Sequence, residues 1–153
     1  YIKGIGETSS HSSINYMEDM SVLDVALKSS TDAYNMAKIS ANEIDFAMVY
    51  DSFTITVLMS LEALGFCNIG EGKEFIKNGN LGPKGSFPMN TNGGGLSYCH
   101  PGMYSIFTLI EACRQIWRIC GKRQIDKEIT NALCHGTGGV LSSAATVILS
   151  KEK

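Results

Sequence analysis

The stretch Asn90-Thr-Asn-Gly-Gly-Gly-Leu-Ser-Tyr-Cys-His-Pro-Gly102 is the most informative segment of the chain, because it places one histidine directly after a glycine-rich bend. Three consecutive glycines allow backbone angles that other residues cannot adopt, and they let main-chain N–H groups come close to a ligand. Pro101 suits the first turn of a helix, where its missing N–H costs nothing. We therefore expect His100 at a rigid corner, with its imidazole directed into a cleft. The alternative is a loop histidine that only hydrogen-bonds its neighbours.

The composition is that of a globular single domain. The chain has 153 residues, of which 44% are hydrophobic and 18% charged, enough apolar material for one core. The formal net charge of −2 argues against a general nucleic-acid binder, which would carry a basic face. No apolar run approaches the roughly 20 residues that span a bilayer, and no signal peptide is recognisable. We expect neither a nucleic-acid partner nor a membrane association.

The cysteines are scattered along the chain, without the close paired spacing of metal ligands. An odd number of cysteines in a domain of this size favours reduced thiols and a cytoplasmic location. No metal site is therefore expected. The five are Cys67, Cys99, Cys113, Cys120 and Cys134.

The sequence begins with Tyr1 rather than with a methionine, inside a segment that is typical of a strand. We therefore expect residues 1–153 to be one domain of a longer protein, with the part that precedes it absent.

The hydrophobic pattern alternates between strands and helices. Apolar residues recur at three- and four-residue steps in the expected helices, and short apolar runs mark the expected strands. The strands are expected at residues 1–7, 46–50, 130–134 and 143–150, the helices at 22–37 (with Asp19 or Ser21 as a cap), 53–64 and 104–120, and a tight turn at 136–139.

This order predicts an α/β fold, with a mixed, mostly parallel sheet and helices on both faces. The last two strands are separated by only a few residues and should pair antiparallel. Ligands of such sheets gather near the carboxyl ends of the strands. The loops 50–53, 90–102 and 134–139 lie at or near such ends, so we expect them to form one site.

Three motifs, in this order, resemble those of the thiolase superfamily. Asn90-Thr-Asn92-Gly93-Gly94 with His100-Pro101 resembles the thiolase motif Asn-x-x-Gly-Gly followed by Gly-His-Pro. Cys134-His-Gly136-Thr-Gly138 resembles the Cys-x-Gly-x-Gly turn. Tyr50-Asp-Ser-Phe53 stands where ordinary thiolases carry Asn-Glu-Ala-Phe, and where the sterol-carrier-protein type carries His-Asp-Cys-Phe.

The resemblance covers essentially the whole chain as the carboxyl-terminal half of a thiolase-fold enzyme, of the sterol-carrier-protein-type or acetyl-CoA acetyltransferase-like branch. It implies an αβαβα layering built from two similar halves, and a nucleophilic cysteine in the amino-terminal half. No cysteine here has a matching context, so the isolated fragment should be inactive. The resemblance also implies a homodimer, and in several relatives a small zinc-ribbon/OB-fold subunit that handles acyl-CoA. Coenzyme A enters as substrate, and no cofactor is implied.

The resemblance also implies roles for individual residues. His100 would activate the nucleophile and donate to a developing oxyanion, and Asn92 and Gly94 would belong to the substrate-binding bend. Cys134 would be the acid/base thiol, with the N–H of Gly136 in an oxyanion hole. In a competing register His135 aligns with the strand-end histidine of the sterol-carrier-protein type. That type carries its acid/base thiol where this chain has Ser52, whose hydroxyl is a far poorer base.

Tyr50 is the main departure from the family pattern, in which an asparagine holds a water that polarises the thioester carbonyl. A phenol is bulkier, could replace that water, and can donate or pass on a proton. Cys99 is a second departure, because glycine normally precedes this histidine. The alternatives for these two side chains are an aromatic core residue at a strand end and a thiol that only fills space.

Three functions are consistent with these residues. The first is an acyl-CoA acyltransferase of lipid metabolism, a thiolase that forms or cleaves a carbon–carbon bond next to a thioester. The second, suggested by Tyr50, is a retro-aldol lyase that acts on a β-hydroxyacyl-CoA. The third is a non-catalytic thiolase-fold subunit that serves as a scaffold.

Overall fold

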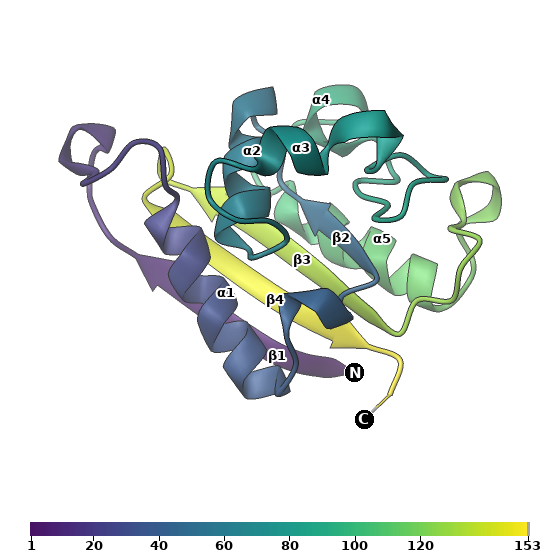
Figure 1. Cartoon of the computed structure of the whole chain (residues 1–153). Helices are drawn as coiled ribbons and strands as arrows, with labels where there is room; N and C mark the ends of the chain where they lie inside the picture. The colour runs from purple at the N-terminus through teal and green to yellow at the C-terminus, as the bar shows by residue number, and fades with distance from the viewer. Residues whose placement is uncertain (153) are drawn as a thin grey trace.

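The computed structural model describes residues 1–152, which form a four-stranded sheet with the strand order β1-β4-β3-β2 (Figure 1). The strands are β1 (Ile2–Ser9), β2 (Phe46–Val49), β3 (Asn131–Gly138) and β4 (Ser143–Ser150). The helices are α1 (Asp24–Ala37), α2 (Thr54–Ala63), α3 (Gly72–Phe75), α4 (Gly94–Ser97) and α5 (Ser105–Ile116). Short 3-10 helices are η1 (Ile14–Tyr16), η2 (Ala41–Glu43), η3 (Lys77–Gly79) and η4 (Gly121–Arg123).

The sheet is mixed, as expected, but the expectation that it is mostly parallel was wrong. β2 and β3 are parallel, whereas β4 pairs antiparallel with both β3 and β1. The physical reason is the position of β4. The short β3–β4 connection forces an antiparallel hairpin, and β4 then lies between β1 and β3, so one reversed strand accounts for two of the three pairings.

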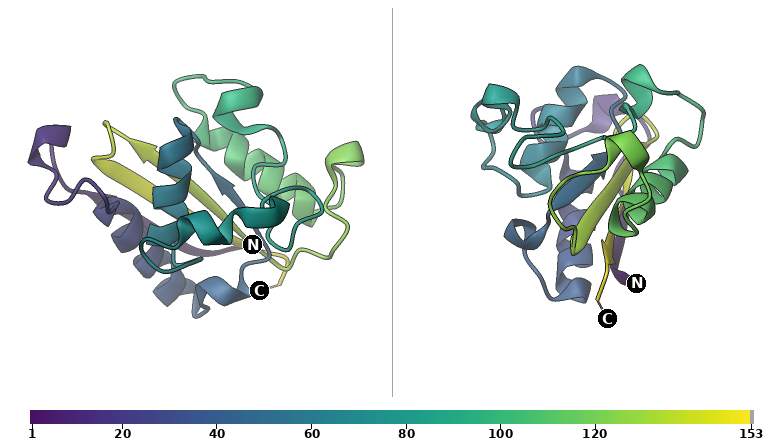
Figure 2. Two further views of the ribbon diagram at one scale, coloured as in Figure 1. Left: turned by 45° about the horizontal axis from the view of Figure 1, so that its top comes forward. Right: turned by 90° about the vertical axis from the view of Figure 1, so that its right-hand side faces the viewer.

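Helices cover both faces of the sheet, as the alternating pattern predicted (Figure 2, right). Successive residues of β2 point to opposite faces. Ala47 and Val49 pack in the core cluster that includes Ala33 and Ala37 of α1, whereas Phe46 and Met48 pack in the cluster that includes Ala112 of α5. All four residues of β2 are therefore buried, which explains why its sequence is a continuous apolar run.

Some element ends differ from the sequence-based expectation. α1 begins at Asp24 with Leu23 at the N-cap position, so neither Asp19 nor Ser21 caps it; the N–H and hydroxyl of Ser21 donate to the Asp19 carboxylate instead. β3 continues to Gly138, so the tight turn predicted at 136–139 begins only at its end. α5 begins at Ser105, four residues after Pro101. None of the helices within residues 1–152 is long and apolar enough to cross a membrane.

Candidate active site

A cavity of about 630 Å³ lies beyond the carboxyl end of β2. Its wall includes residues 50, 52 and 53, residues 100–105, and residues 137–141. Parts of all three loops that the sequence analysis selected thus meet here. Three predicted site residues, Tyr50, Ser52 and His100, line this cavity, and most of the remaining wall is apolar.

Tyr50 and His100 are joined by a hydrogen bond of 2.7 Å between the phenolic oxygen and the imidazole Nε2. Tyr50 directly follows β2, and its backbone N–H donates to the carbonyl of His135 on β3, so the sheet fixes its position. Its ring lies 5.7 Å from the His100 ring and 5.8 Å from the Tyr104 ring, centroid to centroid. A phenol hydrogen-bonded to an imidazole at the wall of a cavity is an arrangement that can pass a proton to or from a ligand.

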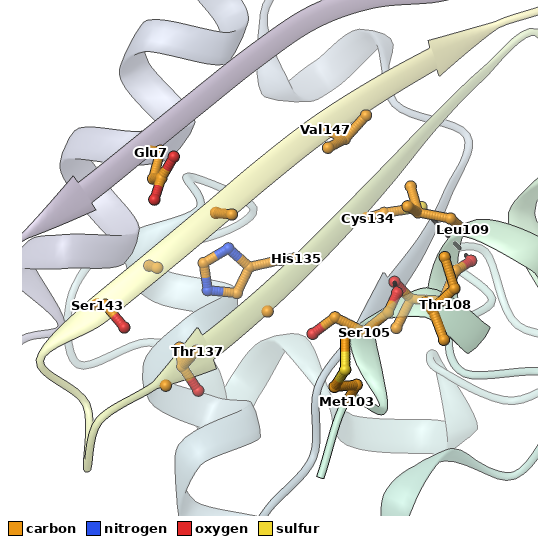
Figure 3. Close-up of a pocket in the computed structure, with 15 residues that line it drawn as sticks. Glu7, Met103, Ser105, Thr108, Leu109, Cys134, His135, Thr137, Ser143 and Val147 are labelled. Atoms are coloured by element: carbon orange, nitrogen blue, oxygen red, sulfur yellow. Dashed lines mark hydrogen bonds between the residues drawn. The ribbon is translucent and has the colours of Figure 1, made fainter. Parts of the chain in front are cut away.

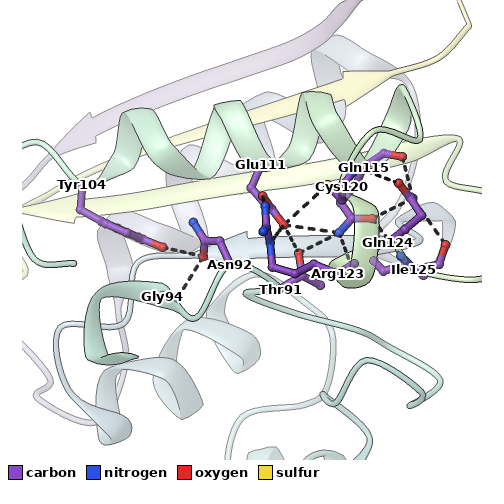
Figure 4. A network of polar contacts seen from close by, with 10 residues as sticks. All are labelled: Thr91, Asn92, Gly94, Tyr104, Glu111, Gln115, Cys120, Arg123, Gln124 and Ile125. Atoms are coloured by element: carbon purple, nitrogen blue, oxygen red, sulfur yellow. Dashed lines mark hydrogen bonds and ion pairs between the residues drawn. The ribbon is translucent and has the colours of Figure 1, made fainter. Parts of the chain in front are cut away.

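The glycine-rich bend is held to the end of β2 by two asparagines. The Asn90 side chain accepts a hydrogen bond from the Val49 N–H and donates one to the Val49 carbonyl, both at 2.8 Å. The Asn92 side-chain oxygen accepts from the Gly94 N–H at 2.9 Å and from the Tyr104 hydroxyl at 3.0 Å (Figure 4). Burial raises the pKa of Tyr104 to about 12, against the opposing effect of this bond from the phenol to Asn92. Asn92 therefore orders the bend rather than lining the cavity.

Backbone angles explain why this bend is rich in glycine. Gly93 has φ 103° and Gly94 has φ 69°, in the left-handed region that residues with a Cβ rarely adopt. Gly94 is also buried. Gly94 shapes the bend and does not line the cavity of Tyr50 and His100, so its role in substrate binding stays a prediction.

A partly buried ionic network, centred on the buried Glu111, supports the other side of the bend (Figure 4). The Glu111 carboxylate on α5 accepts hydrogen bonds from the Thr91 hydroxyl at 2.8 Å and from Arg123 at 3.2 and 3.0 Å. Burial would raise the pKa of Glu111, but the hydrogen bonds from Arg123 and Thr91 and the charge of Arg123 outweigh burial and lower it. The carboxylate is therefore charged and ties the bend to α5.

Cys134 does not line the cavity of Tyr50 and His100. Its thiol points toward α5, where it contacts the Thr108 carbonyl at 3.5 Å, and the residue is only 3% exposed. Burial raises the pKa of this thiol well above its usual range. Cys134 and Gly136 border a second cavity, of about 430 Å³, between α5 and strands β3 and β4 (Figure 3). Met103, Ser105, Thr137 and Gly138 line both cavities, so the two cavities adjoin, whereas Cys134 and Gly136 line only the second.

His135 is buried at the end of the β2–β3 pairing, with 1% of its surface exposed. The His135 Nδ1 lies 2.9 Å from the Thr146 hydroxyl, which in turn lies 2.9 Å from the Ser29 hydroxyl. The His135 Nε2 has no hydrogen-bond partner among residues 1–152. Desolvation lowers the pKa of His135 to about 4. Its side chain is thus neutral; His135 borders the second cavity together with Cys134 and Gly136, and it does not line the cavity of Tyr50 and His100 (Figure 3).

The sequence analysis missed two features of the site. The first is Asp51, which is buried directly after Tyr50. The sequence offered one signal for it, because a carboxylate there ends the apolar run 46–50. Four methionines line the apolar wall of the cavity, namely Met17, Met20, Met59 and Met103. Their positions are unrelated in sequence, so no local pattern could have grouped them. Within residues 1–152, no group of three or more His, Cys, Asp or Glu side chains could hold a metal ion.

The fold and the site define an α/β domain with its candidate active site at the carboxyl end of the parallel strand pair. The family model described as "Thiolase C-terminal domain-like" matches residues 6–151. The chain belongs to this family of the thiolase superfamily, as the resemblance of its three motifs had indicated.

Relatives include both transferases and aldolases. An acetyl-CoA acetyltransferase of Methanothermobacter thermautotrophicus is 31% identical over 155 aligned positions, which cover 99% of this chain and 39% of the relative. A steroid side-chain-cleaving aldolase of Thermomonospora curvata is 43% identical over 83 residues, 53% of this chain and 21% of the relative. The solved structure "Ltp2-ChsH2(DUF35) aldolase" superimposes with a TM-score of 0.86 at 29% identity, covering 99% of this chain and 40% of that one. The chain thus spans about two fifths of the length of the acetyltransferase and of the Ltp2-ChsH2(DUF35) aldolase chain.

Proposed function

We propose that this chain forms the carboxyl-terminal half of the active site of an enzyme that breaks or forms a carbon–carbon bond beside a CoA thioester, with Tyr50 and His100 as the proton-transfer pair. The observation that carries this proposal is the 2.7 Å hydrogen bond between the Tyr50 phenol and His100 Nε2 at the wall of an apolar cavity. Family membership supports it, because the relatives are thiolase-superfamily enzymes.

The geometry favours retro-aldol cleavage of a β-hydroxyacyl thioester. In this reaction the substrate hydroxyl gives its proton to the Tyr50 oxygen as the phenolic proton moves to His100 Nε2. The hydroxyl oxygen becomes a carbonyl while the Cα–Cβ bond breaks, and the electron pair of that bond stays on Cα as a thioester enolate. The enolate then takes up a proton, which returns from His100 through Tyr50, so the pair ends in its starting state.

Two observations support a lyase over a thiolase. None of the five free cysteines in the described part of the chain lines the cavity of Tyr50 and His100, and the Cys134 thiol faces α5. Retro-aldol cleavage needs no thiol. Two of the relatives named above are also aldolases, one at 43% identity over about half of this chain.

Acyl transfer is the second candidate, and the acetyl-CoA acetyltransferase that matches 99% of this chain favours it. In this reaction His100 would activate a nucleophilic cysteine from the amino-terminal half, and backbone N–H groups would stabilise the oxyanion. Cys134 would serve as the acid/base group only if its thiol left the contact with Thr108.

The complete protein supplies the rest of the site in this proposal. The sheet face beside α5 is only partly covered: Ile5 of β1 is 49% exposed and Ile106 of α5 is 50% exposed, with Val147 of β4 beside Ile5 in the register. An open apolar face of this kind marks an interaction site. We infer that the amino-terminal half covers it, that the complete enzyme is a homodimer, and that a small acyl-CoA-binding subunit joins it; the name "Ltp2-ChsH2(DUF35) aldolase", which contains two components, supports a second subunit.

The test uses the complete protein that contains this chain, incubated either with a β-hydroxyacyl-CoA or with a β-ketoacyl-CoA plus free CoA. The proposal predicts that the β-hydroxyacyl-CoA is split into a carbonyl compound and a shorter acyl-CoA, and that Cys134→Ala turns over as the parent does. Thiolysis of the β-ketoacyl-CoA, abolished by Cys134→Ala in a folded protein, would establish the second candidate. Binding of acyl-CoA without turnover of either substrate would overturn both and indicate a non-catalytic subunit.

A further inference from the structure

We propose that Asp51 is a positioning residue that clamps the glycine-rich bend to the end of β2 and thereby sets the contact between Tyr50 and His100. This inference rests on the proposed function, in which those two side chains transfer the proton. Asp51 itself contacts neither the His100 ring nor the Tyr50 hydroxyl through a hydrogen bond; it acts through the backbone between them.

The Asp51 carboxylate is buried and is held by the bend alone. It is 5% exposed, and its two oxygens accept hydrogen bonds from the Gly95 N–H at 2.5 Å and the Leu96 N–H at 3.3 Å. Within residues 1–152 these main-chain amides are its hydrogen-bond partners. A carboxylate withdrawn from water needs such partners, and charge-assisted bonds to N–H groups are stronger than neutral ones. The contact is therefore strong enough to hold a loop.

The glycines of the bend give the carboxylate room to approach. A Cβ built on Gly94 would lie 2.1 Å from Asp51 Oδ2, a distance at which no side chain fits. A Cβ built on Gly95 would lie 3.2 Å from Asp51 Oδ1 and 3.3 Å from His100 Cδ2. The carboxylate and the imidazole thus both lie close to the space that a side chain at position 95 would fill, and the Asp51 carboxylate also binds the Gly95 N–H, so a shift of Gly95 affects both groups.

Tyr50 and Asp51 are adjacent residues at the end of the same buried strand. The Tyr50 N–H is bonded to the His135 carbonyl, and Asn90 pairs with the backbone of Val49, so the strand end is fixed on both sides. The Tyr50 phenol and the Asp51 carboxylate are therefore both attached to the same fixed strand end. The length of the Asp51 side chain then sets the distance between that strand end and the glycine-rich bend. A displacement of about 1 Å in such a pair can cost about 100-fold in rate.

Asp51→Asn tests the clamp, because an amide would turn an N–H donor toward a backbone N–H. The matched control is Asp45→Asn at the other end of β2. Asp45 is also a carboxylate that accepts two backbone N–H groups, those of Thr130 at 2.8 Å and Asn131 at 3.0 Å, but it lies far from the cavity. The loss of a carboxylate–amide contact is thus common to both variants, and only Asp51→Asn disturbs the bend.

In the complete protein, we expect Asp51→Asn to lower kcat for β-hydroxyacyl-CoA cleavage by about 30-fold with KM within about threefold, and to change the shape of the pH profile of kcat. Asp45→Asn should lower the melting temperature but leave kcat within about twofold. If Asp51→Asn does not fold, Gly95→Ala replaces it, with the same expected loss of kcat, because its Cβ presses on the His100 ring.

Equal effects of Asp51→Asn and Asp45→Asn on kcat, or the parent rate for Asp51→Asn and Gly95→Ala, would overturn the clamp. Tyr50→Phe, measured beside them, separates this failure from that of the proposed function. If Tyr50→Phe is inactive while Asp51→Asn works normally, only the clamp is wrong. If Tyr50→Phe keeps full activity, the proposed function itself is wrong.

Discussion

Tyr50 and His100 are far apart in the sequence, yet each is fixed by a different kind of local structure. Tyr50 is held by strand pairing, through its backbone bond to His135. His100 follows a bend whose geometry depends on left-handed glycines and on the Asn90 and Asn92 side chains. The resulting hydrogen bond forms between residues of this chain alone, so the pair is preformed within residues 1–152.

His135 provides a residue-scale prediction on pH and stability. Desolvation holds its pKa at about 4 in the folded state, against 6.5 for an ordinary histidine. Between these values the unfolded chain binds more protons, so the free energy of unfolding is at its full value above about pH 6.5 and decreases as the pH falls toward 4. Between pH 7 and 5 this residue accounts for a loss of roughly 2 kcal/mol. Urea unfolding of the parent and of His135→Gln at both pH values measures it.

The expected result is a smaller pH-dependent loss in His135→Gln than in the parent, because the variant has no proton to take up at this position. Parallel losses in the two proteins would show that His135 is not the group that titrates, and that it is not enclosed as the structure indicates.

At the scale of elements, α5 links the site to the core. One face of the helix packs Ala112 against β2 and β3, and the buried Glu111 holds both Thr91 of the bend and Arg123 of η4. The N-terminal end of the same helix borders both cavities through Ser105. A change in α5 is thus expected to affect stability and the bend together.

Replacement of Glu111 by Gln should lower the free energy of unfolding by about 2 kcal/mol, because it weakens the hydrogen bonds that a buried carboxylate accepts from Thr91 and from the half-exposed Arg123. The control is Glu74→Gln, which breaks an exposed ion pair with Lys77 of 2.6 Å. Solvent screens that pair, so its loss should change stability by less than about 0.5 kcal/mol. Chemical denaturation of the three proteins gives both numbers, and an equal effect of the two substitutions would contradict the account of α5.

The sequence predicted most elements because their patterns are local. Apolar periodicity located α1, α2 and α5, and the apolar run of β2 revealed burial on both faces. The relative directions of the strands were not predictable in the same way. They depend on the insertion of β4 between β1 and β3, which is decided by tertiary packing and not by a local pattern. The side to which Cys134 points followed the pleat of β3 and its packing against Thr108, so motif alignment alone could not establish it.

At the scale of the whole molecule, this domain has one face that is not closed. On the face that α5 covers, Leu149 of β4 is buried beside Ala112 of α5, whereas Ile5 of β1 is 49% exposed; β4 also lines the cavity of Figure 3. The chain spans about two fifths of the length of the two relatives that match 99% of it, and the proposed function assigns the cover of this face to an amino-terminal half.

Replacement of Ile106 by Lys in the complete protein should reduce stability by about 3 kcal/mol, because the side chain would be buried against the amino-terminal half. The control is Ile69→Lys, since Ile69 is 53% exposed and lies outside both cavities. It should leave the melting temperature nearly unchanged. Thermal unfolding of the two variants measures the difference, and an equally small effect of both would show that this face stays open.

The most direct test of the central claim is a double-mutant cycle on kcat in the complete protein, with Tyr50→Phe, His100→Gln and the two combined. Because the phenol and the imidazole pass one proton as a unit, each single change should lower kcat by about 100-fold, and the double variant should be no slower than the slower single variant. Losses that multiply in the double variant, or a single variant that keeps the parent rate, would contradict the claim that these two side chains form one proton-transfer pair.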